Sequence, residues 1–435
     1  MTTEYARSRS ASHRSASPED KNKNAGQEQG RPRLVVVLNS WIAVGFLRGQ
    51  LEHFQDMGFA VTVLCPARRN DEWEVERPRG ITIRELPMER QIAPVRDLLS
   101  LWRLWRALRA LRPTITNVGT PKAGLLGGLA AWLTRVPARF YTLHGLRFET
   151  ATGFKRSLLI HAERLACKFA HRIVCVSHSV REKAIACGLA APERIVVFGS
   201  GSCNGIDASR FAPTPRLAER AGKLRRRLGI PDRATVILFI GRFTRDKGIT
   251  ELMDAFSRLN ERFPDLRLLL VGCFEKEDPL PADTYERLQN NPHVILAGAV
   301  QDTPVCYAAA DIVVLPSHRE GLPTVVLEAQ AAGRPVVAAK ATGIVDLVID
   351  GESGLLFPVG DSAALAQALE RLITDRALVR RLEAGGQEQV RREFQQERIW
   401  DQLHRMYFEA LGKGGRSQGT QHRSPRDKRL IPASR

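Results

Sequence analysis

The sequence predicts an α/β protein with two doubly wound, Rossmann-like domains that face each other across a cleft. The chain of 435 residues is longer than one hydrophobic core usually serves, so two domains are expected. Short β-branched runs alternate with helix-length segments, which is the pattern of parallel β-α units. The pattern restarts after Asp207, which places the boundary between the domains near residues 205–211.

The first domain is expected over residues 31–206. Its strand candidates are nearly continuous in apolar residues, which favours a sheet covered by helices on both faces. Most candidates are separated by segments long enough to form a helix. The strands are expected at residues 34–38, 60–64, 81–86, 114–118, 139–143, 172–176 and 194–198.

The second domain is expected over residues 207–394. The last helical stretch, 395–411, is a candidate to leave this domain and return to the first. In open parallel sheets, ligands bind at the carboxyl ends of the strands, so the loops that follow strands are the places to look for chemistry. The strands are expected at residues 235–240, 266–271, 293–297, 311–315 and 335–339.

Both ends of the chain are expected to be disordered. Residues 1–30 and 412–435 are rich in Ser, Gly, Gln, Asn and charge, and they lack hydrophobic periodicity. The N-terminus has no apolar region of a secretory signal, and no segment reaches the length of a membrane span. Seven unclustered cysteines favour a reducing compartment over a disulfide frame or a zinc site. The sequence therefore predicts a cytoplasmic location.

The net charge of +18 is concentrated in two places. Residues 101–200 hold 16 Lys and Arg against 4 Asp and Glu, and residues 412–435 hold 7 against 1. A basic protein of this kind could bind nucleic acid, but no helix-turn-helix, zinc finger or aromatic RNA-binding motif is present. The charge therefore favours an anionic membrane surface as the partner over a nucleic acid.

The stretch R-E-G-L-P-T-V-V-L-E, which begins at Arg319, follows a strand and opens a helix. We expect Pro323 at the first helical position, where its missing N–H costs nothing. The backbone N–H groups at this helix N-terminus would then bind a diphosphate. These groups are those of Gly321, Leu322, Thr324 and Val325. Glu320 and Glu328 lie on either side of this site. Two carboxylates beside a phosphate site are reasonable if they hold neutral hydroxyls, those of a ribose and of a sugar.

The stretch G-R-F-T-R-D-K-G, which begins at Gly241, also follows a buried strand. Gly241 permits close approach of the backbone to a ligand. Arg242 and Lys247 leave the same loop, and together they can neutralise a diphosphate. The two stretches therefore predict one nucleotide-sugar site in the second domain.

With these motifs in order, the chain resembles the retaining glycosyltransferases of family 4, which have the two-domain GT-B fold. The resemblance covers about residues 33–411. It implies that Arg242 and Lys247 bind the donor diphosphate, that Glu328 binds the ribose and that Glu320 holds the donor sugar. It also implies that neither metal nor cofactor is needed. The motifs that carry it are acid-x7-acid at 320–328, G-R-x-x-x-x-K-G at 241–248 and N-G-I-D at 204–207.

Two positions of the first domain match further family motifs. His144 stands at the end of a strand in T-L-H-G, and the resemblance implies that it approaches the donor sugar. Gly45 lies in S-W-I-A-V-G-F, at the place of the family's glycine-rich donor loop. That loop has two glycines in many relatives and one here.

The run G-T-P-K-A-G-L-L-G at 119–127, together with T-L-H-G-L-R-F-E-T, resembles the subgroup that builds bacterial surface polysaccharides on undecaprenyl diphosphate. Lys122 and Arg147 would lie on the acceptor side. Such a lipid stays in the bilayer, so we expect the enzyme to associate peripherally with the inner face of the membrane. The helix at 98–112 suits this role because Trp102 stands among the arginines of its exposed face.

Two other enzyme classes share features with the chain. A nucleotide-sugar epimerase on the same fold would need the donor site but no lipid acceptor. A dinucleotide oxidoreductase is not supported, because the glycines at 199, 201 and 205 have the wrong spacing and no helix follows them.

Overall fold

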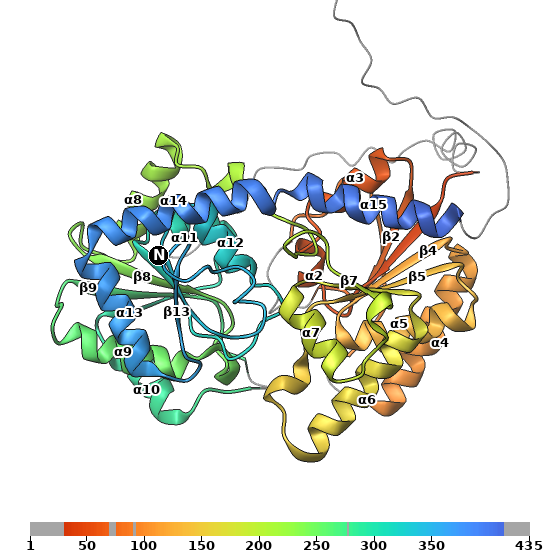
Figure 1. Ribbon diagram of the computed structural model, residues 1–435, viewed down its shortest axis with the longest axis horizontal. Coiled ribbons are helices and arrows are strands. Elements are labelled where there is room, and N and C mark those ends of the chain that lie inside the picture. Colours follow the sequence, from red (N-terminus) through yellow and green to blue (C-terminus); the bar gives the residue numbers. More distant parts are fainter. Residues whose placement is uncertain (1–29, 69–74, 90–92, 276–277, 413–435) are drawn as a thin grey trace, which may run out of the picture.

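The computed structural model confirms two doubly wound α/β domains, each built on one parallel sheet. They lie side by side in Figure 1, with the first domain in red to yellow and the second in green to blue. The expected disordered segments, 1–30 and 412–435, fall outside the described residues except for Gly30 and Gly412. The structure describes residues 30–68, 75–89, 93–275 and 278–412.

The first sheet has the strand order β3-β2-β1-β4-β5-β6-β7, with every neighbouring pair parallel. The order reverses between β1 and β4, as in doubly wound folds that bind ligands at this point. The strands are β1 (Arg33–Val37), β2 (Ala60–Cys65), β3 (Thr82–Glu85), β4 (Ile115–Gly119), β5 (Ala138–Leu143), β6 (Arg172–Cys175) and β7 (Ile195–Val196).

Alternation along β1 divides the core of the first domain into two layers. Val35 and Val37 face one layer, and Leu34 and Val36 face the other, because successive side chains of a strand point to opposite faces. The first layer lies under α4 (Pro94–Leu111), α5 (Pro121–Leu133), α6 (Gly153–Phe169) and α7 (His178–Ala186). The second lies under α2 (Ile42–Gly45), α3 (Gln50–Asp56) and α15 (Gln396–Gly412).

The second sheet has the order β10-β9-β8-β11-β12-β13, and it is also parallel throughout. Its strands are β8 (Thr235–Ile240), β9 (Leu266–Val271), β10 (Val294–Gly298), β11 (Ile312–Leu315), β12 (Val336–Ala339) and β13 (Leu355–Phe357). Its helices are α8 (Pro215–Arg227), α9 (Ile249–Asn260), α10 (Ala282–Asn290), α11 (Thr303–Ala308), α12 (Thr324–Ala331), α13 (Ser362–Thr374) and α14 (Arg376–Glu393).

Helix α15 leaves the second domain and packs on the first, along the top of the molecule in Figure 1. Its Tyr407 is fully buried between the rings of Phe54 and Phe140, whose centroids lie 5.4 and 4.8 Å away. The Tyr407 hydroxyl accepts a hydrogen bond of 2.8 Å from Asn117 Nδ2 on β4. Helix α15 is therefore part of the core of the first domain.

Apart from one-residue shifts at element ends, three elements differ from the sequence expectation. The strand expected at 194–198 is only Ile195–Val196, because β7 is the last strand of its sheet and pairs on one side only. The helix expected at 98–112 begins earlier, at Pro94, whose fixed φ suits a first helical residue. Strand β13 was not expected. Its three residues are too short for a periodic pattern, and it forms by pairing with β12.

None of the helices that the structure describes combines the length and apolar character needed to cross a bilayer. None of the seven cysteines forms a disulfide.

Candidate active site

The two donor-side motifs lie at the carboxyl ends of β8 and β11, the neighbouring strands at which the order of the second sheet reverses. The structure brings Lys247 and Glu320 together across this point, with 2.5 Å between Lys247 Nζ and Glu320 Oε1. Both side chains are largely shielded, at 16% and 14% exposure. Arg242, from the same loop as Lys247, forms a 2.6 Å ion pair with Glu275 after β9. Two cations and two carboxylates therefore surround one strand-end region.

Polar contacts join the two donor-side loops. The His318 N–H donates to the Asp246 carbonyl (2.8 Å), and the Arg319 guanidinium pairs with the Asp246 carboxylate (2.7 Å). A glycine is required at 248, because its φ is +69° and a Cβ there would overlap with the Pro316 carbonyl oxygen. The hydrogen bond to Glu251 raises the pKa of His318.

Helix α12 begins at Thr324, one residue later than expected. Pro323 is its N-cap residue and not the first helical residue, because its ψ of 113° is extended. The first hydrogen bond at this end runs from the Val326 N–H to the Pro323 carbonyl (3.1 Å). The N–H groups of Thr324 and Val325 precede it, so they are the donors with which this helix end can bind an anion.

Glu328 is held by residues for which the sequence offered no motif. The Tyr307 hydroxyl donates a 2.8 Å hydrogen bond to Glu328 Oε2. Burial raises the pKa of Glu328 above its ordinary value, while Tyr307, the Arg210 guanidinium and the Thr303 hydroxyl act in the opposite direction. Tyr307 lies on α11 and Arg210 lies just after the boundary between the domains. Their proximity to Glu328 arises only from the fold.

We expect the pH dependence of donor binding to depend on Tyr307. If the Glu328 carboxylate accepts hydrogen bonds from a ribose, donor KM rises as the pH falls through its raised pKa. This rise begins above the ordinary glutamate value of about 4.3. Tyr307→Phe removes a hydrogen bond that lowers this pKa, so the rise should begin at a still higher pH. KM measured against pH checks this, with Tyr285→Phe on an exposed α10 site as the control. Superimposable profiles would contradict it.

His144 and Gly321 meet at the interface between the domains. A Cβ on Gly321 would overlap with the His144 carbonyl oxygen, and a Cβ on Gly145 would lie 3.2 Å from the Gly321 Cα. Burial lowers the pKa of His144 to about 4, so its imidazole is neutral at pH 7. The structure therefore places a neutral histidine of the first domain beside the loop that carries Glu320.

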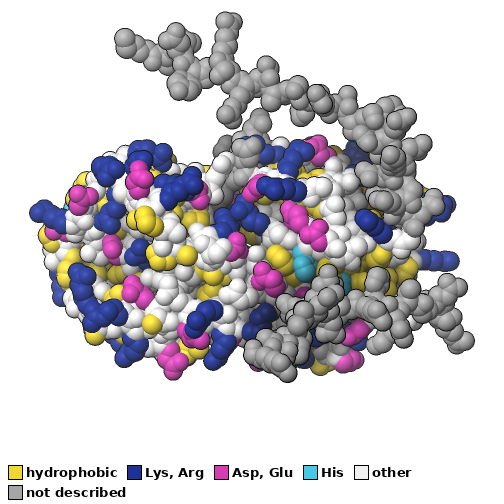
Figure 2. Space-filling view, turned by 90° about the horizontal axis from the view of Figure 1, so that it is seen from above, with side chains coloured by type: hydrophobic (Ala, Val, Ile, Leu, Met, Phe, Trp, Pro, Cys, Tyr) yellow, Lys and Arg dark blue, Asp and Glu magenta, His cyan; other side chains and the backbone are white. Residues whose placement is uncertain are grey.

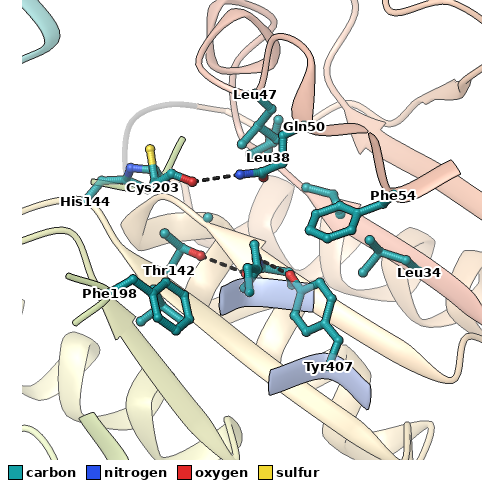
Figure 3. A pocket seen from close by; sticks show the side chains of 15 residues that line it. Leu34, Leu38, Leu47, Gln50, Phe54, Thr142, His144, Phe198, Cys203 and Tyr407 are labelled. Atoms are coloured by element: carbon teal, nitrogen blue, oxygen red, sulfur yellow. Dashed lines mark hydrogen bonds between the residues drawn. The ribbon is translucent and has the colours of Figure 1, made fainter. Parts of the chain in front are cut away.

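Next to His144 lies a cavity of about 20 Å³ between the first sheet and α15 (Figure 3). Thr142 Oγ1 donates to Asn117 Oδ1 (2.9 Å), and Asn117 in turn donates to Tyr407. Gln50 Nε2 donates to the Cys203 carbonyl (2.7 Å) at the opposite wall. This volume holds about one water molecule and no sugar, so the cavity is not a substrate site.

The remaining expected residues are more dispersed. Leu322 packs against Gly201 of the first domain. Its Cδ1 lies 3.0 Å from the position that a Cβ on Gly201 would occupy. Gly45 ends α2, and the space around its Cα is filled by Val75. Lys122 forms an ion pair with Asp97 of α4, with 2.5 Å between Lys122 Nζ and Asp97 Oδ1, and only 12% of the Lys122 side chain is exposed. Arg147 is exposed and begins the short 3-10 helix η1 (Arg147–Thr150), which follows His144.

Two family models match the chain, one for each domain. Residues 45–201 match the glycosyl transferase 4-like domain, and residues 221–389 match glycosyl transferases group 1.

Two curated relatives are similar over most of their length. The chain is 36% identical to the capsular polysaccharide biosynthesis glycosyltransferase CapM of Staphylococcus aureus, over 86% of this chain and 95% of that protein. It is 30% identical to the UDP-Gal:alpha-D-GlcNAc-diphosphoundecaprenol alpha-1,3-galactosyltransferase of Escherichia coli, over 66% of this chain and 74% of that one.

Solved structures share the fold at lower identity. Alr3699/HepE of Anabaena, in complex with UDP and glucose, has a TM-score of 0.71 and 21% identity, and the match covers 86% of this chain and 98% of that chain. Sucrose-phosphate synthase of Thermosynechococcus elongatus has a TM-score of 0.72 and 22% identity, with 88% and 100% covered. The family models and the 36% identity to the Staphylococcus aureus relative over most of both chains show that the chain belongs to the group 1 glycosyltransferases, which have the GT-B fold.

Proposed function

We propose that the protein transfers a hexose or N-acetylhexosamine, with retention, from a UDP-sugar to a glycan carried on undecaprenyl diphosphate. The observation that supports this best is the shielded Lys247–Glu320 pair beside the N-terminus of α12. Cationic groups and backbone N–H donors suit a diphosphate, and the flanking carboxylates suit the hydroxyls of a ribose and a sugar. The relative from Escherichia coli, whose name gives a UDP donor and a diphosphoundecaprenol acceptor, supports the substrate classes.

The chemistry follows from the charges in this region. When the bond between the sugar and the diphosphate breaks, its electron pair stays on the phosphate oxygen, where negative charge grows. Lys247 and Arg242 stabilise that charge, so the proposal needs no metal ion. Glu320 holds the sugar by its hydroxyls, and neutral His144 offers a hydrogen-bonding ring on the opposite side. Glu328 accepts the ribose hydroxyls.

A donor screen tests the proposal. Purified protein is incubated with UDP-glucose, UDP-galactose, UDP-N-acetylglucosamine, GDP-mannose or ADP-glucose, with and without a bacterial membrane extract as acceptor. We expect UDP release with one UDP-sugar, and only when the extract is present. Interconversion of UDP-sugars without extract, followed by NMR, would favour the epimerase instead. If no donor gave either nucleotide release or interconversion, both functions would be contradicted.

We propose that the first domain docks on the inner face of the cell membrane through α4 and α6. Both helices pack against α5, so they lie on the same side of the sheet. Val95, Leu98 and Trp102 of α4 are 73%, 68% and 50% exposed, and Phe154 of α6 is 84% exposed. The Arg106 guanidinium lies 4.8 Å from the centre of the Trp102 ring. Exposed apolar groups bordered by arginines suit an anionic lipid surface.

The charge on the second domain has a different distribution. On the face that carries α14 and α15, acidic side chains lie between the basic ones over the second domain (Figure 2). A surface of mixed charge attracts anionic lipid less than a basic one does.

Liposome binding should therefore depend on α4. We expect sedimentation with anionic but not neutral liposomes, and less of it at high salt, because salt screens surface charge over about 8 Å. Arg103→Glu with Arg106→Glu should reduce binding. Arg376→Glu with Arg380→Glu, the same change on exposed positions of α14, should reduce it less. Equal binding to neutral liposomes, or an equal loss in both double variants, would refute this docking mode.

A further inference from the structure

Polar contacts between the domains gather on the loop that follows β12, residues 341–346, which we call the bridging loop. We propose that Asp346 of this loop and Ser179 of the first domain are positioning residues. They act through the bridging loop to hold Glu320 and Gly321 against His144. The role of Glu320 rests on the proposed function, but the contacts themselves do not.

The bridging loop supports the backbone of the Glu320 loop directly. The Glu320 N–H donates to the Thr342 carbonyl oxygen at 3.1 Å. Gly343 has a φ of +78°, and a Cβ there would lie 3.0 Å from the Glu320 carbonyl oxygen and would overlap with that of Gly321. Only glycine permits this approach. A shift of the bridging loop would therefore move Glu320 and Gly321 with it.

The same loop is bound to the N-terminus of α7 in the first domain. Asp346 Oδ1 accepts the backbone N–H of Ser179 at 3.0 Å, and the Ser179 hydroxyl donates to Asp346 Oδ2. Ser179 Oγ also accepts the Gly343 N–H, at 2.8 Å. Ser179 is the second residue of α7, so Asp346 places its charge at the positive end of a helix that belongs to the other domain. This contact joins the two domains, so it would break if they separated.

A second set of contacts crosses the interface nearby. Thr342 Oγ1 donates to Glu149 Oε2 at 2.8 Å, and Lys183 of α7 pairs with the same carboxylate at 2.6 Å. Arg319 Nε donates to Thr150 Oγ1 at 3.0 Å. Glu149 and Thr150 follow shortly after His144 in the chain, and Arg319 precedes Glu320. The crossing contacts therefore flank the point at which His144 and Gly321 meet.

This arrangement assigns nucleotide binding and sugar transfer, two steps of the proposed reaction, to different sets of contacts. The groups assigned to the nucleotide, Arg242, Lys247 and Glu328, all belong to the second domain. The contacts of Asp346 and Ser179 exist only when the domains are together. Loss of these contacts should therefore leave nucleotide binding nearly intact while it lowers turnover, because His144 and the acceptor side would no longer be aligned with the donor sugar.

The experiment compares Asp346→Ala and Ser179→Ala with Asp361→Ala. Asp361 is the matched control: it accepts the Ala364 N–H at 2.9 Å and caps α13 within a single domain. We expect kcat to fall by about tenfold or more in the first two variants, and the Kd for UDP to change by less than about threefold. Small-angle X-ray scattering should show a larger radius of gyration for them. The control should match the wild type in all three measurements.

Two further variants test the chemistry of the contact. Ser179→Thr keeps the hydroxyl and should retain most of the wild-type turnover. The double variant Asp346→Ala with Ser179→Ala should be no worse than either single variant, because both remove one shared network. Additive losses would overturn the inference, as would a loss of UDP affinity as large as the loss of turnover. An unchanged radius of gyration in both single variants would also overturn it. The scattering measurement needs no activity, so it remains decisive even if the wild type transfers no sugar.

Discussion

Lys247→Ala is expected to lower kcat by about a hundredfold or more, because in the proposed reaction it removes a charge that stabilises the departing diphosphate. The side chain is only 16% exposed, so water replaces its charge poorly. Arg242→Ala should lower kcat by a similar factor, since the Arg242 guanidinium extends from the same loop. The measurement is steady-state UDP release with the donor identified by the screen. Lys223→Ala is the matched control, because Lys223 also pairs with a glutamate but on the exposed surface of α8.

Loss of Lys247 also leaves Glu320 without its ion-pair partner in a shielded place, and this should lower stability as well as activity. A thermal melt separates the two effects. In Lys247→Ala with Glu320→Gln, the unpaired charge is gone, so the melting temperature should recover while turnover stays low. Recovery of turnover in this double variant would show that the ion pair is structural. Turnover equal to that of Lys223→Ala would contradict the assigned role of Lys247.

Gly321→Ala is expected to abolish most of the activity without unfolding the protein. The added methyl group would overlap with the His144 carbonyl oxygen, so the two domains could not keep their contact. No positive φ is involved, so the second domain itself accommodates alanine. A displacement of about 1 Å at the reacting groups costs on the order of a hundredfold in rate.

Turnover and a thermal melt check the Gly321 prediction together. Gly222→Ala on α8 is the control, since its new methyl group would meet only the tip of Arg226 at 3.5 Å. Alanine in a helix interior is favoured over glycine by about 0.5–1 kcal/mol, so this control should melt slightly higher at full activity. Wild-type turnover in Gly321→Ala would show that the contact with His144 can be dispensed with.

The donor-side loops could be predicted because their chemistry is local in sequence. One buried strand is followed by G-R-x-x-x-x-K-G and another by E-G-L-P. Each motif therefore places its polar groups at the end of a strand, independently of the rest of the fold. The fold adds that β8 and β11 are neighbours, which brings Lys247 and Glu320 together across 73 positions. The family resemblance already pointed to one site for both.

The residues that the sequence could not indicate are those whose partners are remote and carry no pattern. Tyr307 looks like any core tyrosine until its hydroxyl is found on Glu328, 21 positions away. Ser179 and Asp346 are separated by 167 positions, and each alone resembles an ordinary cap or surface acid. The N-cap position of Pro323 could not be predicted for a different reason. A proline suits both the N-cap and the first helical position, and only its ψ angle distinguishes the two.

The return of α15 to the first domain has a consequence for the order in which the protein matures. Tyr407, Leu403 and Ile399 fill a core whose other members lie between Leu34 and Phe198. Synthesis proceeds from the N-terminus, and domains usually fold as they emerge from the ribosome. The first domain to be made is here completed only after the second, because α15, which fills part of one layer of its core, follows residue 394 in the chain. A nascent chain halted after residue 394 would expose an apolar sheet face, which is a surface that chaperones bind.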